Sequence, residues 1–234
     1  RAAIAATPSI GAGFFIVSVL GNLTVESCQV INTGISQQGE VAQGSTLWGI
    51  AIGFVLACQI NQNKVFYTNL DSLANIDLNP VHRALLIVGW LSSSDSDIRY
   101  PLLGNALVTN NFFQGVGLPH LVEFFKNPNA PQAGFEQTNF SYNQCFHLQT
   151  QTNQPSLGLS AVGIRPANAT VSTWGRQIIA TGNHIKANNP NFPSLDLSNP
   201  EQATLMSNIA SGSIFNFGTG VKPSSPEDFN VYPP

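Results

Sequence analysis

Short apolar runs bounded by Gly, Asn and Pro dominate the hydrophobic pattern along the chain. Residues 14–20 are β-branched and aromatic, and residues 23–31 contain alternating apolar and polar positions. Both segments predict strands, joined as a hairpin at the turn-forming pair Gly21-Asn22. The same criteria indicate strands at 64–68, 142–152, 157–165, 173–180 and 214–217.

Three other segments carry helix signals. Pro80 opens 81–91, Pro119 opens 120–126, and Pro200 with an acidic first turn opens a helix within 198–209. The apolar segment 47–58 fits a buried strand and a buried helix equally well. No internal repeat and no heptad run are found.

Strand signals outnumber helix signals, so we expect a β-rich fold, all-β or α+β, built as an antiparallel sandwich or barrel with a few inserted helices. The chain is interpreted as a single domain, 1–234, with a possible sub-boundary in the Asn/Pro stretch 127–131. Residues 223–234 are expected to form an extended Pro/Ser tail.

Two uncharged segments, 2–25 and 41–63, raise the question of contact with lipid. Their apolar stretches cover 14–20 and 47–58, shorter than the ~20 residues that a helix needs to cross a bilayer. Both are therefore interpreted as core, and a membrane is not expected as a partner. The chain opens with Arg1 instead of Met, which is typical of a processed product.

Charge is scarce: the 234 residues include 9 Lys and Arg and 12 Asp and Glu, a net charge of −3. No basic cluster is present, which argues against nucleic acid as a partner. Polarity comes instead from 24 Asn and 15 Gln, a surface chemistry more common in secreted and coat proteins than in cytosolic ones. An extracellular location is expected, with sequons at Asn22, Asn139 and Asn168 as possible glycosylation sites.

The three cysteines, Cys28, Cys58 and Cys145, have no zinc-like or CxxC spacing. Cys28 and Cys58 could form a disulfide in an oxidising compartment, or all three could be buried thiols.

Catalytic candidates are few. His120 and Glu123 would share one face of a helix, and Cys145 and His147 would share one face of a strand. Asp95 and Asp97 could offer two carboxylates to a metal ion from a Ser-rich loop. No sequence motif of a hydrolase, P-loop protein, dinucleotide enzyme or zinc protease is present, and no cofactor is implied.

Asn110, Asn111, Phe112, Phe113 and Gln114 form a segment in which amides adjoin aromatic rings, a combination suited to binding sugars or another subunit. The sequence thus predicts a non-enzymatic module that acts by surface contact, through self-assembly or recognition of carbohydrate or protein. The alternative is a secreted hydrolase with a His/carboxylate site, possibly assisted by a metal.

Overall fold

The computed structural model describes residues 10–31, 46–66, 81–89, 103–115, 120–126, 134–147, 160–166, 175–187, 195–196 and 202–211. Every element in these ranges is a β-strand, and every strand pair is parallel. The β-rich expectation is confirmed. The antiparallel sandwich or barrel is wrong, because each strand pairs with its counterpart from the next turn of the chain.

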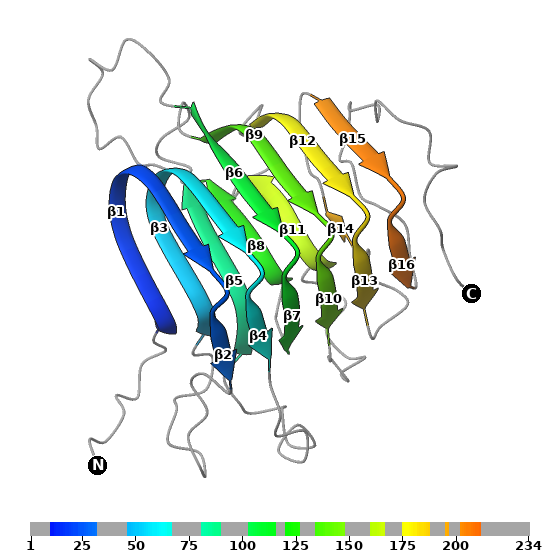
Figure 1. Ribbon diagram of the computed structural model, residues 1–234, viewed down its shortest axis with the longest axis horizontal. Helices are drawn as coiled ribbons and strands as arrows, with labels where there is room; N and C mark the ends of the chain where they lie inside the picture. The colour runs from blue at the N-terminus through cyan, green and yellow to red at the C-terminus, as the bar shows by residue number, and fades with distance from the viewer. Residues whose placement is uncertain are drawn as a thin grey trace.

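The chain winds in successive coils along one axis, which Figure 1 shows running from β1 at the left to β15 and β16 at the right. A later coil has three strands, one on each face of the molecule. These coils are β5 (Val81–Gly89), β6 (Leu103–Thr109) and β7 (Phe112–Gly115); β8 (His120–Lys126), β9 (Gly134–Ser141) and β10 (Gln144–His147); β11 (Ser160–Pro166), β12 (Gly175–Thr181) and β13 (His184–Ala187); and β14 (Leu195–Asp196), β15 (Gln202–Met206) and β16 (Ile209–Ser211).

The first two coils differ in that one long strand covers two faces. β1 (Ile10–Glu26) precedes β2 (Gln29–Ile31), and β3 (Thr46–Asn61) precedes β4 (Lys64–Phe66). The start of β3 pairs with β5, and its end pairs with β6. β3 therefore joins two faces into one sheet of order β14-β11-β8-β5-β3-β6-β9-β12-β15, with β1 also on β3. The third face is a six-stranded sheet, β16-β13-β10-β7-β4-β2. This arrangement is a parallel β-helix.

The core lies inside the coils, where residues at equivalent positions stack from one coil to the next. Val108, for example, is in register with Ile60 on one side and Phe140 on the other, and all three are fully buried. The faces approach closely at Gly49, where an added Cβ would overlap Val65 Cγ1 and lie 2.9 Å from the Ala84 carbonyl oxygen. Only glycine fits at that position without a shift of the backbone.

Several predicted elements are wrong. β5 and β8 replace the helices predicted at 81–91 and 120–126, and β15 with the first residue of β16 occupies half of the third helical segment. The hairpin at Gly21-Asn22 is one continuous strand, β1, with a shift of register between Val19 and Asn22. The coils are also an internal repeat, which the sequence analysis did not detect.

The local signals failed because proline and acidic residues near a segment start are also compatible with the ends of strands. Tertiary pairing then decides between helix and strand. The possible boundary at 127–131, the strand at 214–217 and the tail at 223–234 lie outside the described residues.

The two uncharged segments include β3 and all of β1 except Glu26, and β3 supplies the fully buried Ile50, Ile52 and Ile60. Within the described ranges, no helix has the length and apolar character required to span a bilayer.

Candidate functional site

Each coil turns into the six-stranded sheet through two residues of fixed conformation. The first of the two has a positive φ. In successive coils it is Ser27, Gln62, Asn110, Tyr142, Gly182 and Ser207. The second is asparagine in every coil except the first, which has Cys28. Most residues in this left-handed region pay a steric penalty, so its repetition indicates that the surrounding contacts hold the turn in place.

The second turn residues form an asparagine column: Asn63, Asn111, Asn143, Asn183 and Asn208, all buried. Asn143 shows the pattern. Its Nδ2 donates to the carbonyl oxygen of Val108 (2.8 Å) and to Asn183 Oδ1 (3.2 Å). Its Oδ1 accepts from the backbone N–H and the Nδ2 of Asn111, both at 3.0 Å.

The column solves a hydrogen-bonding problem created by the turn. Where the chain changes direction, backbone groups such as the Val108 carbonyl and the Asn111 N–H are buried and cannot pair with a neighbouring strand. A short planar amide supplies one acceptor and two donors from the same side chain, which no other side chain of that length does. The column therefore keeps the coils in register and makes the adjoining sheet a regular surface.

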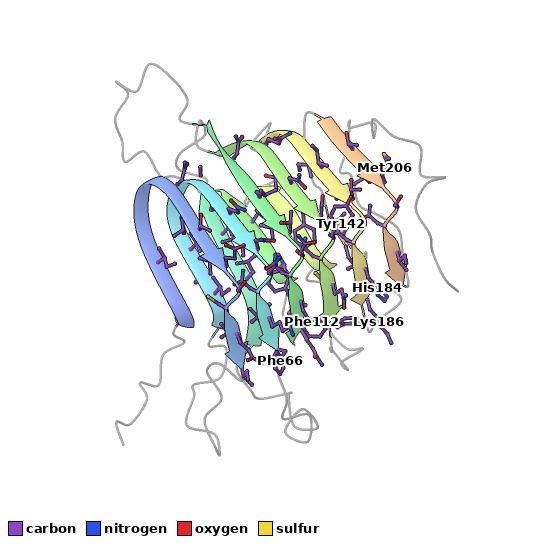
Figure 2. All side chains as sticks on the ribbon, in the orientation of Figure 1. Phe66, Phe112, Tyr142, His184, Lys186 and Met206 are labelled. Carbon is purple, nitrogen blue, oxygen red and sulfur yellow. The ribbon has the colours of Figure 1, made fainter. Side chains whose placement is uncertain are left out.

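On the outer face of that sheet lies an aromatic row, Phe66, Phe112, Phe146 and His184. Its successive ring centroids are 6.4, 5.5 and 5.4 Å apart. The phenylalanine side chains are half-buried and His184 is exposed. The residues between them on the same strands, such as Val65 and Phe113, face inward and are buried. Figure 2 shows Phe66, Phe112 and His184 on β4, β7 and β13, across the lower sheet of that view.

A shallow hollow with a volume of about 750 Å³ adjoins this row and the turns above it. Phe66 and Phe112 contribute apolar surface, and Tyr142, which is 61% exposed, stands at the edge of the turns. The polar lining consists mostly of amides: Gln62, Asn63, Asn110, Asn111, Gln114 and Gln144. The hollow thus combines aromatic side chains with neutral hydrogen-bonding groups.

Charge on the six-stranded sheet has one sign. None of its strands contains Asp or Glu, whereas β4 carries Lys64 and β13 carries Lys186, both exposed. Neither ammonium group has an ion-pair partner among the residues that the structure describes. This face is therefore cationic in a chain whose net charge is −3.

The binding segment predicted at 110–114 is divided between the surface and the interior. Asn110 is exposed in the turn, and Phe112 and Gln114 are half-buried on β7; all three line the hollow. Phe113 is fully buried in the core, and Asn111 is buried in the asparagine column. The segment is a turn followed by a strand.

The predicted pair His120 and Glu123 is not assembled as the sequence suggested, whereas Cys145 and His147 lie two residues apart on one strand, β10, as predicted. His120 and Glu123 belong to β8, so the helical spacing that would have paired them does not exist; register places His120 beside Ser160 and Glu123 beside Leu86 and Gly163. Cys145 is fully buried, and burial raises the pKa of its thiol well above the ordinary value. His147 is the last residue of β10.

All three cysteines are free thiols. Cys58 is buried, and desolvation raises the pKa of its thiol to about 12. Cys28 is half-buried at the head of the asparagine column, where its N–H donates to Asn63 Oδ1 (2.9 Å). Because the Cys28 side chain has no amide, the column ends at this first coil.

No group of three or more His, Cys, Asp and Glu side chains that could hold a metal occurs in the described ranges. Asp95 and Asp97 lie outside those ranges, as does the sequon at Asn168. Asn22 is exposed on β1. Asn139 is half-buried on β9 and accepts a hydrogen bond from Ser141 Oγ.

Sequence reasoning missed Phe66, Phe146, His184, Lys64 and Lys186 as surface neighbours. The sequence does contain a signal of this arrangement. In Gln62–Phe66, Tyr142–Phe146 and Gly182–Lys186, the second residue is asparagine, and the residues after it alternate between the outer face and the core. The asparagines of successive coils are separated by 48, 32, 40 and 25 residues. These unequal spacings hide the repeat from a search for a fixed period.

No protein-family model matches the chain, and neither a curated protein nor a solved structure matches it significantly.

Proposed function

We propose that this protein is a binding module that recognises an unbranched polysaccharide on the outer face of its six-stranded sheet. The observation that carries the proposal is the aromatic row, whose rings succeed one another at 6.4, 5.5 and 5.4 Å across β4, β7, β10 and β13. Sugar rings present apolar C–H faces that pack on aromatic side chains, and a row of such side chains offers a platform to several sugars in succession.

The amides beside the row support the same proposal. Gln114 is half-buried and Gln62, Asn110 and Gln144 are exposed around the hollow, so their donors and acceptors are accessible to sugar hydroxyls. The scarcity of charge and the three sequons support a place of action outside the cytoplasm, where such polymers occur.

Affinity electrophoresis through gels that contain hydroxyethyl cellulose, a neutral linear β-glucan, tests the proposal. We expect the protein to be retarded, and Phe146→Ala to weaken the retardation at least tenfold because one stacking surface is lost. Ile31→Ala is the matched control: it removes an exposed apolar side chain from β2 of the same sheet, outside the row.

Urea unfolding of both variants would show whether they remain folded. The proposal is rejected if the folded protein is retarded neither by hydroxyethyl cellulose nor by its carboxymethylated counterpart. Equal binding by Phe146→Ala and Ile31→Ala would likewise reject the aromatic row as the site.

A second candidate function is self-association of the coils end to end. The first and last described coils expose apolar side chains: Ile31 is 47% exposed on β2, Met206 is 44% exposed on β15, and Ile209 is 42% exposed on β16. Stacking the last coil of one copy on the first coil of another would continue the parallel pairing. Sedimentation velocity over a range of protein concentrations tests this self-association. A single monomeric species at every concentration would exclude it. The double variant Ile31→Gln/Ile209→Gln should abolish any larger species.

A further inference from the structure

We infer that the polysaccharide bound by the aromatic row is acidic and carries carboxylate groups, which Lys64 and Lys186 hold at the two ends of the row. This inference rests on the proposed function and specifies its ligand class. It follows from the position of the only two lysines on the six-stranded sheet.

Each lysine shares a strand with one end of the row. Lys64 is on β4 with Phe66, and Lys186 is on β13 with His184. β7 and β10 lie between these strands, so the lysines are three strand spacings apart along the axis, about 14 Å at ~4.8 Å per spacing. A polymer that follows the row across the strands would reach both ammonium groups.

The absence of Asp and Glu from all six strands strengthens the argument. A face with both acidic and basic residues would bind a neutral glycan equally well. The strands of this sheet have no carboxylate that would repel an anionic glycan. Both lysines are exposed, and within the described part of the chain neither has an ion-pair partner. No carboxylate of the described ranges would therefore compete with a ligand carboxylate for either ammonium group.

The spacing of the charges also discriminates between anionic polymers. A single-stranded nucleic acid carries one phosphate per nucleotide and is bound by a continuous cationic groove. Here phenylalanine rings and the amides of Gln114 and Gln144 separate two cations. That pattern fits a chain in which uncharged sugars separate widely spaced carboxylates, as in a glycan that combines neutral sugars with uronic acids or in a partly carboxylated glycan.

The test compares carboxymethyl cellulose with hydroxyethyl cellulose, which share a linear β-glucan backbone and differ in charge. We expect carboxymethyl cellulose to bind at least tenfold more tightly at low salt, and most of that advantage to disappear at 1 M salt because the exposed charges are screened. The double variant Lys64→Gln/Lys186→Gln should lose the advantage and keep its affinity for the neutral polymer.

Two variants serve as controls. Lys64→Arg/Lys186→Arg keeps both charges and should retain the preference, and Lys126→Gln removes a lysine from β8, outside the six-stranded sheet, and should leave it unchanged. Tighter binding of oligothymidylate than of carboxymethyl cellulose would overturn the inference in favour of nucleic acid.

The outcomes separate the inference from the proposed function. Equal binding of the two celluloses, with a strong effect of Phe146→Ala, would overturn the acidic ligand and leave polysaccharide recognition standing. Binding of neither polymer would remove both.

Discussion

The ring of Tyr142 lies against Gly182, the residue at the equivalent turn position of the next coil. A Cβ added to Gly182 would lie 2.6 Å from both Cδ1 and Cε1 of the tyrosine ring. Both residues have positive φ, 58° for Tyr142 and 65° for Gly182. The absence of a side chain at one turn thus creates the space for an exposed aromatic ring at the edge of the hollow.

Gly182→Ala should lower the free energy of unfolding by about 2 kcal/mol, because an L-residue in the left-handed region costs about 1–2 kcal/mol and the tyrosine ring must also move. Urea unfolding measures the effect. Ser207→Ala is the control, since Ser207 already occupies the same turn position with φ 55°. A Gly182→Ala variant as stable as Ser207→Ala would contradict the close contact.

Asn143→Ala should destabilise the protein by about 3 kcal/mol, because it leaves the buried Val108 carbonyl and the Asn111 N–H without partners, at about 1–3 kcal/mol each. Asn105→Ala is the control: Asn105 is exposed on β6, and its loss should change stability by less than about 0.5 kcal/mol. If chemical denaturation shows similar effects for the two variants, the asparagine column does not hold the coils together.

Thr138→Val should raise the free energy of unfolding by about 1 kcal/mol. Thr138 is fully buried on β9, and its hydroxyl has no hydrogen-bond partner among the described residues. Valine has nearly the same shape and removes the cost of desolvating that hydroxyl. Thermal unfolding would measure the change, with Thr24→Val on the exposed face of β1 as the comparison. If Thr138→Val lost stability and Thr24→Val did not, the Thr138 hydroxyl would have to make a hydrogen bond in the folded protein.

Stability should fall at alkaline pH because of the buried thiols. The Cys58 thiol has a pKa of about 12 in the folded protein, against about 8.5 in an unfolded chain. Between these values the unfolded state has lost the proton and the folded state has kept it, so the free energy of unfolding falls by up to about 1.4 kcal/mol per pH unit for each such thiol. Cys145 contributes in the same direction.

Denaturation curves from pH 8 to pH 11 would test this dependence. The double variant Cys58→Ala/Cys145→Ala should show a shallower decline than the original protein, and each single variant an intermediate one. Identical slopes for all four proteins would mean that neither thiol is shielded from water.

The binding segment 110–114 shows how far local sequence information reaches. Its composition indicated amides and rings in contact with a ligand, and the structure places Asn110, Phe112 and Gln114 along the hollow. Composition could not distinguish Phe112 from Phe113, because the choice between outer face and core depends on the phase of the strand. Nor could it bring Phe66 or Phe146 beside Phe112, since no local pattern links residues on different coils.

The sequence by itself determined that the protein is rich in β-strands, because β-branched and aromatic residues favour an extended backbone wherever the chain places them. Only the tertiary structure decided that these strands are parallel and coiled, and that polar residues such as Asn111 and Asn143 belong inside. Their amides are satisfied by partners on other coils, 32 residues away where Asn111 and Asn143 bond each other, and the unequal connections between coils hide that pairing from a search for a fixed period. The reason is that a buried amide is stable only where another coil supplies its hydrogen bonds.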